Sequence, residues 1–230
     1  LASNGWRAIL WRTSIDWRVF RGNAIGSLAA LAAFTVIQLV ASKPVARKPR
    51  PQLGISAAFA PDGALWMVVL DAQGKLFVQR SAAFAAGAAP TWEAPRLLET
   101  DGDPVSADGE NHPKLLFGPN AVVLIAYTRP LAKPNTGYVR MLRSTDGGRT
   151  FSRPFTVHAD RQELTHRFES MAFDAKGVLH AIWIDKRDLE AAPSVGGRSS
   201  YRGAAIYRNQ SADAGLTFGP DTKVADHSCE

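Results

Sequence analysis

An octapeptide that occurs twice constrains the fold of this chain more than any other feature. Residues 144–151 read STDGGRTF and residues 211–218 read SADAGLTF, with Ser, Asp, Gly, Thr and Phe at the same offsets. Such a repeat indicates one supersecondary unit that recurs along the chain. Asp accepts backbone N–H groups from the residues that follow, and Gly adopts conformations that a side chain penalises. We therefore predict a hairpin turn at each copy, after which Phe151 enters a strand and packs in the core.

A second spacing accompanies the repeated turn. Phe59, Phe117 and Phe173 each precede a turn rich in Gly, Pro, Asp or Asn, and they are 58 and 56 residues apart. Ten residues after each lies a residue of an apolar strand: Val69, Tyr127 and Trp183. A period near 57 residues suits one four-stranded blade of a β-propeller. The alternative all-β architecture is a β-sandwich.

The spacing predicts three blades, at about residues 53–103, 110–160 and 166–226, the first with a degenerate turn between Ser81 and Trp92. From the first-strand Phe to the Ser of the turn the distance is 22, 27 and 38 residues in successive blades. This growth falls in the connection between strands 2 and 3, at the opposite end of the blade from the octapeptide. Since variable loops often carry binding residues, we predict the binding face at that end.

The pattern S-x-D-x-G-x-T-F resembles the Asp box of the sialidase-like (neuraminidase superfamily) β-propellers, over about residues 53–226. The chain is similar to an N-terminal portion of an exported bacterial member. In that family the box is structural and lies away from the catalytic face. The resemblance thus implies a structural role for ten residues: Ser144, Asp146, Gly148, Thr150, Phe151, Ser211, Asp213, Gly215, Thr217 and Phe218.

Sialidases of this fold bind the substrate carboxylate with three arginines and use an Asp acid/base and a Tyr/Glu nucleophile. The nearest match to the first family arginine is Arg50, in a poor version of its motif. The later arginines and the tyrosine come from blades C-terminal to the three predicted here. No arginine triad is therefore assigned by residue.

The predicted binding face collects charged and aromatic residues from the second and third blades. Asp185, in the charged run 183–188, is the candidate acid/base by its position. Asn111 and His166 begin the second and third blades on the same face. The candidate binding residues are His112, Arg129, Arg167, Glu169, Arg187, Tyr201 and Arg202. The alternative is a solvated loop of ion pairs with core histidines. His112 and His166 lack metal-ligand spacing, and we predict neither a metal nor another cofactor.

The N-terminal segments predict a membrane anchor. Residues 22–42 are uncharged and mostly apolar, which is long enough to span a hydrocarbon core of about 30 Å. A basic Trp/Arg-rich segment, 1–21, precedes them, and a Pro-rich basic linker, 43–52, leads to the propeller at 53–230. We expect a single pass through the inner membrane with the propeller on the periplasmic side. A cleaved signal peptide and a buried helix remain alternatives.

The charge distribution restricts the partners. The formal charge is +6, but residues 1–50 hold eight Lys/Arg and one Asp, so the remainder carries −1. The propeller therefore offers no basic surface that would indicate nucleic acid. Cys229 is the lone cysteine, which excludes an internal disulfide.

The resemblance implies an anchored, exported glycosidase of the exo-α-sialidase type that acts on acidic glycans. The alternative is a non-catalytic periplasmic propeller that binds a protein or glycan, or an assembly factor. If the chain is a fragment, the open faces of a half-ring are expected to self-associate.

Overall fold

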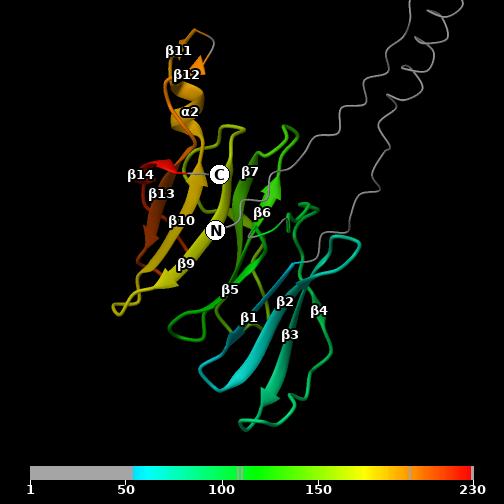
Figure 1. The fold of residues 1–230 in the computed structure, drawn as a ribbon. Helices are drawn as coiled ribbons and strands as arrows, with labels where there is room; N and C mark the ends of the chain where they lie inside the picture. The colour runs from blue at the N-terminus through cyan, green and yellow to red at the C-terminus, as the bar shows by residue number, and fades with distance from the viewer. Residues whose placement is uncertain (1–53, 108, 110, 197, 229–230) are drawn as a thin grey trace, which may run out of the picture. The chain divides into compact units, whose positions relative to one another are not determined.

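The computed structural model describes residues 54–107, 109, 111–196 and 198–228 (Figure 1). The chain divides into two compact units, residues 1–49 and 50–230. The predicted juxtamembrane segment, anchor and linker, 1–52, lie outside the described residues. Within the described ranges, no helix has the length and apolar character needed to cross a membrane.

Three four-stranded antiparallel sheets make up the second unit (Figure 1). Blade 1 contains β1 (Ile55–Phe59), β2 (Ala64–Leu70), β3 (Leu76–Ala83) and β4 (Arg96–Leu97). Blade 2 contains β5 (Lys114–Phe117), β6 (Val123–Pro130), β7 (Gly137–Ser144) and β8 (Phe155–Thr156). Blade 3 contains β9 (His166–Phe173), β10 (Leu179–Asp185), β13 (Ala204–Ser211) and β14 (Thr222–Ser228). In each sheet the strands pair in chain order, which confirms the predicted up-and-down blades.

Two apolar cores join the sheets face to face. One lies between blades 1 and 2 and includes Trp66, Ile125 and Tyr127. The other lies between blades 2 and 3 and includes Leu124 and Trp183. Because successive residues of a strand point to opposite faces, β6 supplies Leu124 to one core and Ile125 to the other. Blade 2 is therefore buried on both faces, which accounts for the unbroken apolar run in β6.

The octapeptide turns have the hydrogen bonds that their residue types predict. Ser144 Oγ accepts the Gly148 N–H at 2.8 Å and donates to Asp146 Oδ1 at 2.7 Å. Asp146 in turn accepts the Thr150 hydroxyl at 2.6 Å and its N–H at 2.9 Å. Ser211, Asp213, Gly215 and Thr217 repeat these bonds in blade 3. These bonds, with that from Thr150 the strongest, hold the pKa of the Asp146 carboxyl far below its usual range.

The glycine of each octapeptide has a second role that the turn chemistry does not predict. Gly148 has φ +78°, and a Cβ there would lie 2.6 Å from Cη2 of Trp66 in blade 1. Gly215 has φ +84°, and its Cβ would lie 3.0 Å from Cε of Met141 in blade 2. Each turn thus packs on the core of the preceding blade.

Connections between second and third strands lie at the other end of the blades. They comprise residues 71–75, 131–136 and 186–203. The last contains helix α2 (Arg187–Ala191) and a hairpin of β11 (Ser194–Val195) and β12 (Arg198–Ser199), which extend beyond β10 (Figure 1). The predicted growth of this connection is therefore present in the structure.

Candidate functional site

The predicted binding-face residues fall into separate groups. His112, Arg167 and Glu169 gather around Asn111 and Thr128, a group that we call the Glu169 cluster. Asp185 and Arg187 form a second group, the Asp185 cluster. Tyr201 and Arg202 lie in a third, beside β14.

Arg129 belongs to none of the three groups. Its Nε lies 3.1 Å from Asp103 Oδ1 as an ion pair, without hydrogen-bond geometry, and its side chain is 41% exposed. Asp103 also accepts from the Tyr127 hydroxyl at 3.0 Å and from Arg140 Nε at 2.8 Å. Burial, reinforced by the Asp103 carboxylate, raises the pKa of Tyr127. Tyr127 and Thr128 are neighbours in β6, so Asp103 and Glu169 lie on opposite sides of blade 2.

Asp185, the predicted acid/base, is fully buried. Its Oδ1 accepts the Arg187 backbone N–H at 2.9 Å and Nε at 3.0 Å. Its Oδ2 accepts Trp183 Nε1 at 2.9 Å and Arg187 Nη2 at 2.6 Å. Arg187 Nη2 also donates to Asp221 Oδ2 at 2.9 Å, which ties the start of α2 to the end of the third octapeptide connection. Since donors occupy both oxygens of Asp185, this geometry gives the carboxylate a structural task.

The basicity of Arg187 reflects the same contacts. Burial alone would lower the pKa of its guanidinium, but the hydrogen bonds to Asp185 and Asp221 raise it. The guanidinium carbon also lies 4.0 Å from the centre of the Tyr207 ring. A charged, stacked Arg187 therefore locks the longest connection onto blade 3.

Two buried histidines pack beside the Asp185 cluster. His158 and His166 stack with ring centres 4.0 Å apart and planes 7° apart. His158 Nε2 accepts the Val139 N–H at 3.2 Å, so its proton is on Nδ1, which donates to the Asp160 carbonyl at 2.6 Å. Burial, followed by the charge of His166, lowers the pKa of His158 to about 3. Across the described residues, no group of three His, Cys, Asp or Glu side chains is suited to hold a metal ion.

The third group lies at the edge of blade 3. Tyr201 donates to Asp226 Oδ1 at 2.7 Å, and its ring centre lies 4.5 Å from that of His227. Lys223 bridges Asp226 and Asp188 at 3.0 and 2.7 Å. Arg202 is exposed, and its backbone N–H donates to His227 Nδ1 at 3.4 Å. These contacts attach β14 to the longest connection.

The Glu169 cluster lies between the inner strands of blades 2 and 3. Thr128 Oγ1 is 2.6 Å from Asn111 Oδ1 and 3.1 Å from Glu169 Oε2. Asn111 Nδ2 donates to Ser106 Oγ at 3.0 Å. His112 lies at the margin, where its Nε2 is 3.2 Å from Lys114 Nζ.

A backbone irregularity directs Glu169 inward. The register of β9 against β10 shifts between Ile182 and Ile184, so Phe168 and Glu169 together oppose Trp183. Phe168 has φ +58°, which is uncommon for a residue with a side chain. Its N–H donates to Asn111 Oδ1 at 3.3 Å, and its ring lies 5.0 Å from the Arg167 guanidinium carbon. The bulge thus turns Glu169 toward Thr128 of the neighbouring blade.

Glu169 is the acid with the most perturbed environment. It is 1% exposed, and its Oε1 makes no hydrogen bond among the described residues. Burial raises the pKa of Glu169 to about 7, against the lowering effects of its own backbone N–H and the charges of Lys114 and Arg167. A carboxylic acid that keeps its proton near neutral pH is a candidate general acid.

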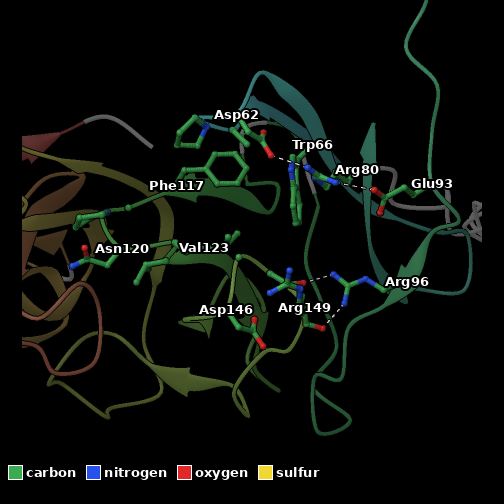
Figure 2. A pocket seen from close by; sticks show the side chains of 18 residues that line it. Asp62, Trp66, Arg80, Glu93, Arg96, Phe117, Asn120, Val123, Asp146 and Arg149 are labelled. Carbon is green, nitrogen blue, oxygen red and sulfur yellow. Dashed lines mark hydrogen bonds and ion pairs between the residues drawn. The ribbon is translucent and has the colours of Figure 1, made fainter. Parts of the chain in front are cut away.

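The largest hollow lies elsewhere, at the Asp-box end between blades 1 and 2 (Figure 2). It has a volume of about 1080 Å³, and Trp66 and Phe117 in its wall pack edge to face at 5.6 Å. Arg80 pairs with Asp62 and Glu93 at 2.7 and 2.9 Å, and Arg96 donates to the Arg149 carbonyl at 2.6 Å (Figure 2). Of the described residues that line it, none belongs to the predicted binding face. This pairing of the charges favours a structural hollow.

Sequence reasoning missed several partners of the candidates. Thr128, Ser106, Asp103 and Asp221 were not predicted, and Asn111 was placed on the face without a role. Thr128 is a polar residue at the end of an apolar strand, which was the available signal. Its partner Glu169 is 41 positions away, so strand alternation alone could not pair them.

Comparisons with known proteins agree on the architecture. No protein-family model matches the chain, and no curated protein matches it either. The GH93 α-L-arabinofuranosidase of Fusarium graminearum is 13% identical with a TM-score of 0.54, over 80% of this chain and 53% of that one. An α-L-arabinanase of Penicillium chrysogenum gives 13% and 0.51, over 81% and 53%. A Hadza microbial sialidase gives 18% and 0.43, over 73% and 36%.

The chain spans about half the length of the two arabinan-degrading enzymes. At such low identity, the similarity shows the fold alone. The described part of the chain therefore folds as three blades of a β-propeller, an architecture that it shares with glycoside hydrolases.

Proposed function

We propose that the propeller containing these blades is a glycoside hydrolase in which Glu169 is the general acid. The carrying observation is a buried carboxyl on the inner strand of blade 3, with a pKa near 7 and an Oε1 without a hydrogen-bond partner in the described residues. In glycosidases one carboxylic acid protonates the glycosidic oxygen as its bond to the anomeric carbon breaks. At neutral pH, about half of the Glu169 population would carry the required proton.

The substrate and the location remain as the sequence predicts them. We propose an acidic glycan, because the half-exposed Arg129 and the cations of Lys114 and Arg167 lie near this end of blades 2 and 3. Residues 22–42 would anchor the protein in the inner membrane and place the propeller in the periplasm. Asp103 is not the second carboxylate of the reaction, since blade 2 separates it from Glu169.

Turnover of fluorogenic glycosides by the product of the full reading frame tests this function. The panel contains an α-sialoside, a β-glucuronide and an α-L-arabinofuranoside. We expect hydrolysis of at least one, and a loss of about 10²–10⁴-fold in kcat for Glu169→Gln, which keeps the shape but cannot act as the acid. Glu163→Gln is the matched control, because Glu163 is exposed on the connection that precedes β9. Equal turnover in wild type and Glu169→Gln would remove the catalytic role.

A non-catalytic propeller that binds a protein or glycan is the second candidate. It is favoured by the Asp185 cluster, where charges of the longest connection are bound to one another. On this reading, the full product is retained on an acidic glycan or partner column and hydrolyses none of the three glycosides.

A further inference from the structure

The hydroxyl of Thr128 faces two oxygen atoms and has only one proton. Its Oγ1 lies 2.6 Å from Asn111 Oδ1 and 3.1 Å from Glu169 Oε2. Two oxygens at 2.6 Å require a proton between them, because bare lone pairs repel at that distance. The position of the hydroxyl proton therefore depends on which atom of the Asn111 amide faces Thr128.

The backbone of β9 fixes the orientation of that amide. The Phe168 N–H, which can only donate, points at the same Asn111 atom from 3.3 Å, so this atom must be the acceptor Oδ1. The amide nitrogen of Asn111 then donates to Ser106 Oγ at 3.0 Å. Oδ1 carries no proton, and the short bond must therefore use the Thr128 proton.

The remaining contact determines the state of Glu169. With its proton on the Asn111 bond, Thr128 offers only a lone pair to Glu169 Oε2. A carboxylate oxygen has nothing to donate to it, whereas a carboxylic acid does. We infer that Thr128 is a positioning residue that accepts the proton of Glu169 from Oε2 and, with Asn111, holds this side chain in its acid form.

The surroundings agree with this assignment. Burial favours the neutral acid, and the charged groups that face it are Lys114 from β5 and Arg167 from β9, which favour the carboxylate. The other buried ion pairs between these blades involve Asp185 and Arg187. The Thr128–Asn111 pair would thus offset the two cations, so that the acid keeps its proton.

The catalytic meaning of this pair rests on the proposed function, but the proton assignment does not. The proton stays on Oε2 in the resting protein and leaves Oε1 as the unpaired oxygen. When a glycosidic oxygen accepts that proton, Glu169 becomes a carboxylate and its bond to Thr128 breaks. The Thr128 proton stays on the bond to Asn111.

Infrared titration of the full protein tests the assignment without any substrate. The C=O band of a protonated carboxylic acid that is present in wild type at pH 6 and absent in Glu169→Gln identifies Glu169. Thr128→Val removes the acceptor of that proton, so we expect the pKa of Glu169 to fall by about one unit. Thr128→Ser keeps the hydroxyl and should restore the wild-type value.

The sign of the shift decides the result. If Thr128 donated to a carboxylate, Thr128→Val would raise the pKa of Glu169, and a rise or no change would overturn the assignment. Absence of the acid band in wild type at pH 6 would also overturn it, even if the Thr128 variant did not fold. If the pKa shifts as expected but no variant hydrolyses a glycoside, the proposed function fails and the proton assignment stands.

Discussion

Replacement of Glu169 by Gln should make the protein more stable than wild type as the pH rises. Below pH 4.5 the wild-type carboxyl is protonated in both the folded and unfolded chains, so its ionisation does not affect stability. Between pH 4.5 and 7 the unfolded chain releases this proton and the folded chain retains it, so wild-type stability falls. One pKa unit corresponds to about 1.36 kcal/mol, and the rise from 4.5 to about 7 gives a loss of about 3 kcal/mol.

Glutamine does not titrate, and its Nε2 can donate to Thr128 in place of the acid proton. The variant should therefore gain about 3 kcal/mol relative to wild type between pH 4.5 and 8. Urea denaturation of the full chain at several pH values measures this difference, with the fluorescence of the buried Trp66 and Trp183 as the signal. The exposed Glu163→Gln should show no such trend. A stability difference that is constant with pH would refute the buried, protonated state of Glu169.

Three further outcomes follow from other parts of the chain. His158 binds a proton only in the unfolded chain between pH 6.5 and about 3, so wild-type stability falls as the pH falls; urea titrations of His158→Gln should lack this part of the slope. Gly148→Ala should lose about 2–5 kcal/mol in thermal denaturation through its positive φ and contact with Trp66, whereas Gly147→Ala, with φ +70° and open space, should lose about 1–2 kcal/mol. Equal losses would contradict the packing role of Gly148. Deletion of residues 1–46 should release the exported protein from sedimented membranes, and continued sedimentation would reject the predicted anchor.

The fold was predictable because its main signals are local. Asp146 and Thr150 form their turn within four residues, so the octapeptide determines the hairpin without reference to the rest of the chain. The phenylalanines that set the period, Phe59, Phe117 and Phe173, end the first strands of the three sheets. The packing of Gly148 on Trp66 was not predictable, because it joins separate blades.

The site was less predictable because its contacts link distant residues. Glu169 was among the candidates, but Thr128 and Asn111 reach it from 41 and 57 or more positions away. Asp185 stood out as an acid on a charged loop. Its partner Arg187 is two positions on, and only the turn into α2 brings that guanidinium back over the carboxylate. The catalytic role predicted for Asp185 stays a prediction.

The contact between each octapeptide glycine and the blade before it imposes a direction on folding during synthesis. Trp66 emerges from the ribosome early, but the turn that covers it is complete only when Gly148 has emerged. Met141 waits in the same way for Gly215. Each blade is therefore finished by its successor, and a nascent chain always carries one incompletely covered core. Chaperones that bind exposed aromatic surface would meet this protein at its newest blade, and a ribosome stalled shortly before residue 148 would leave Trp66 uncovered.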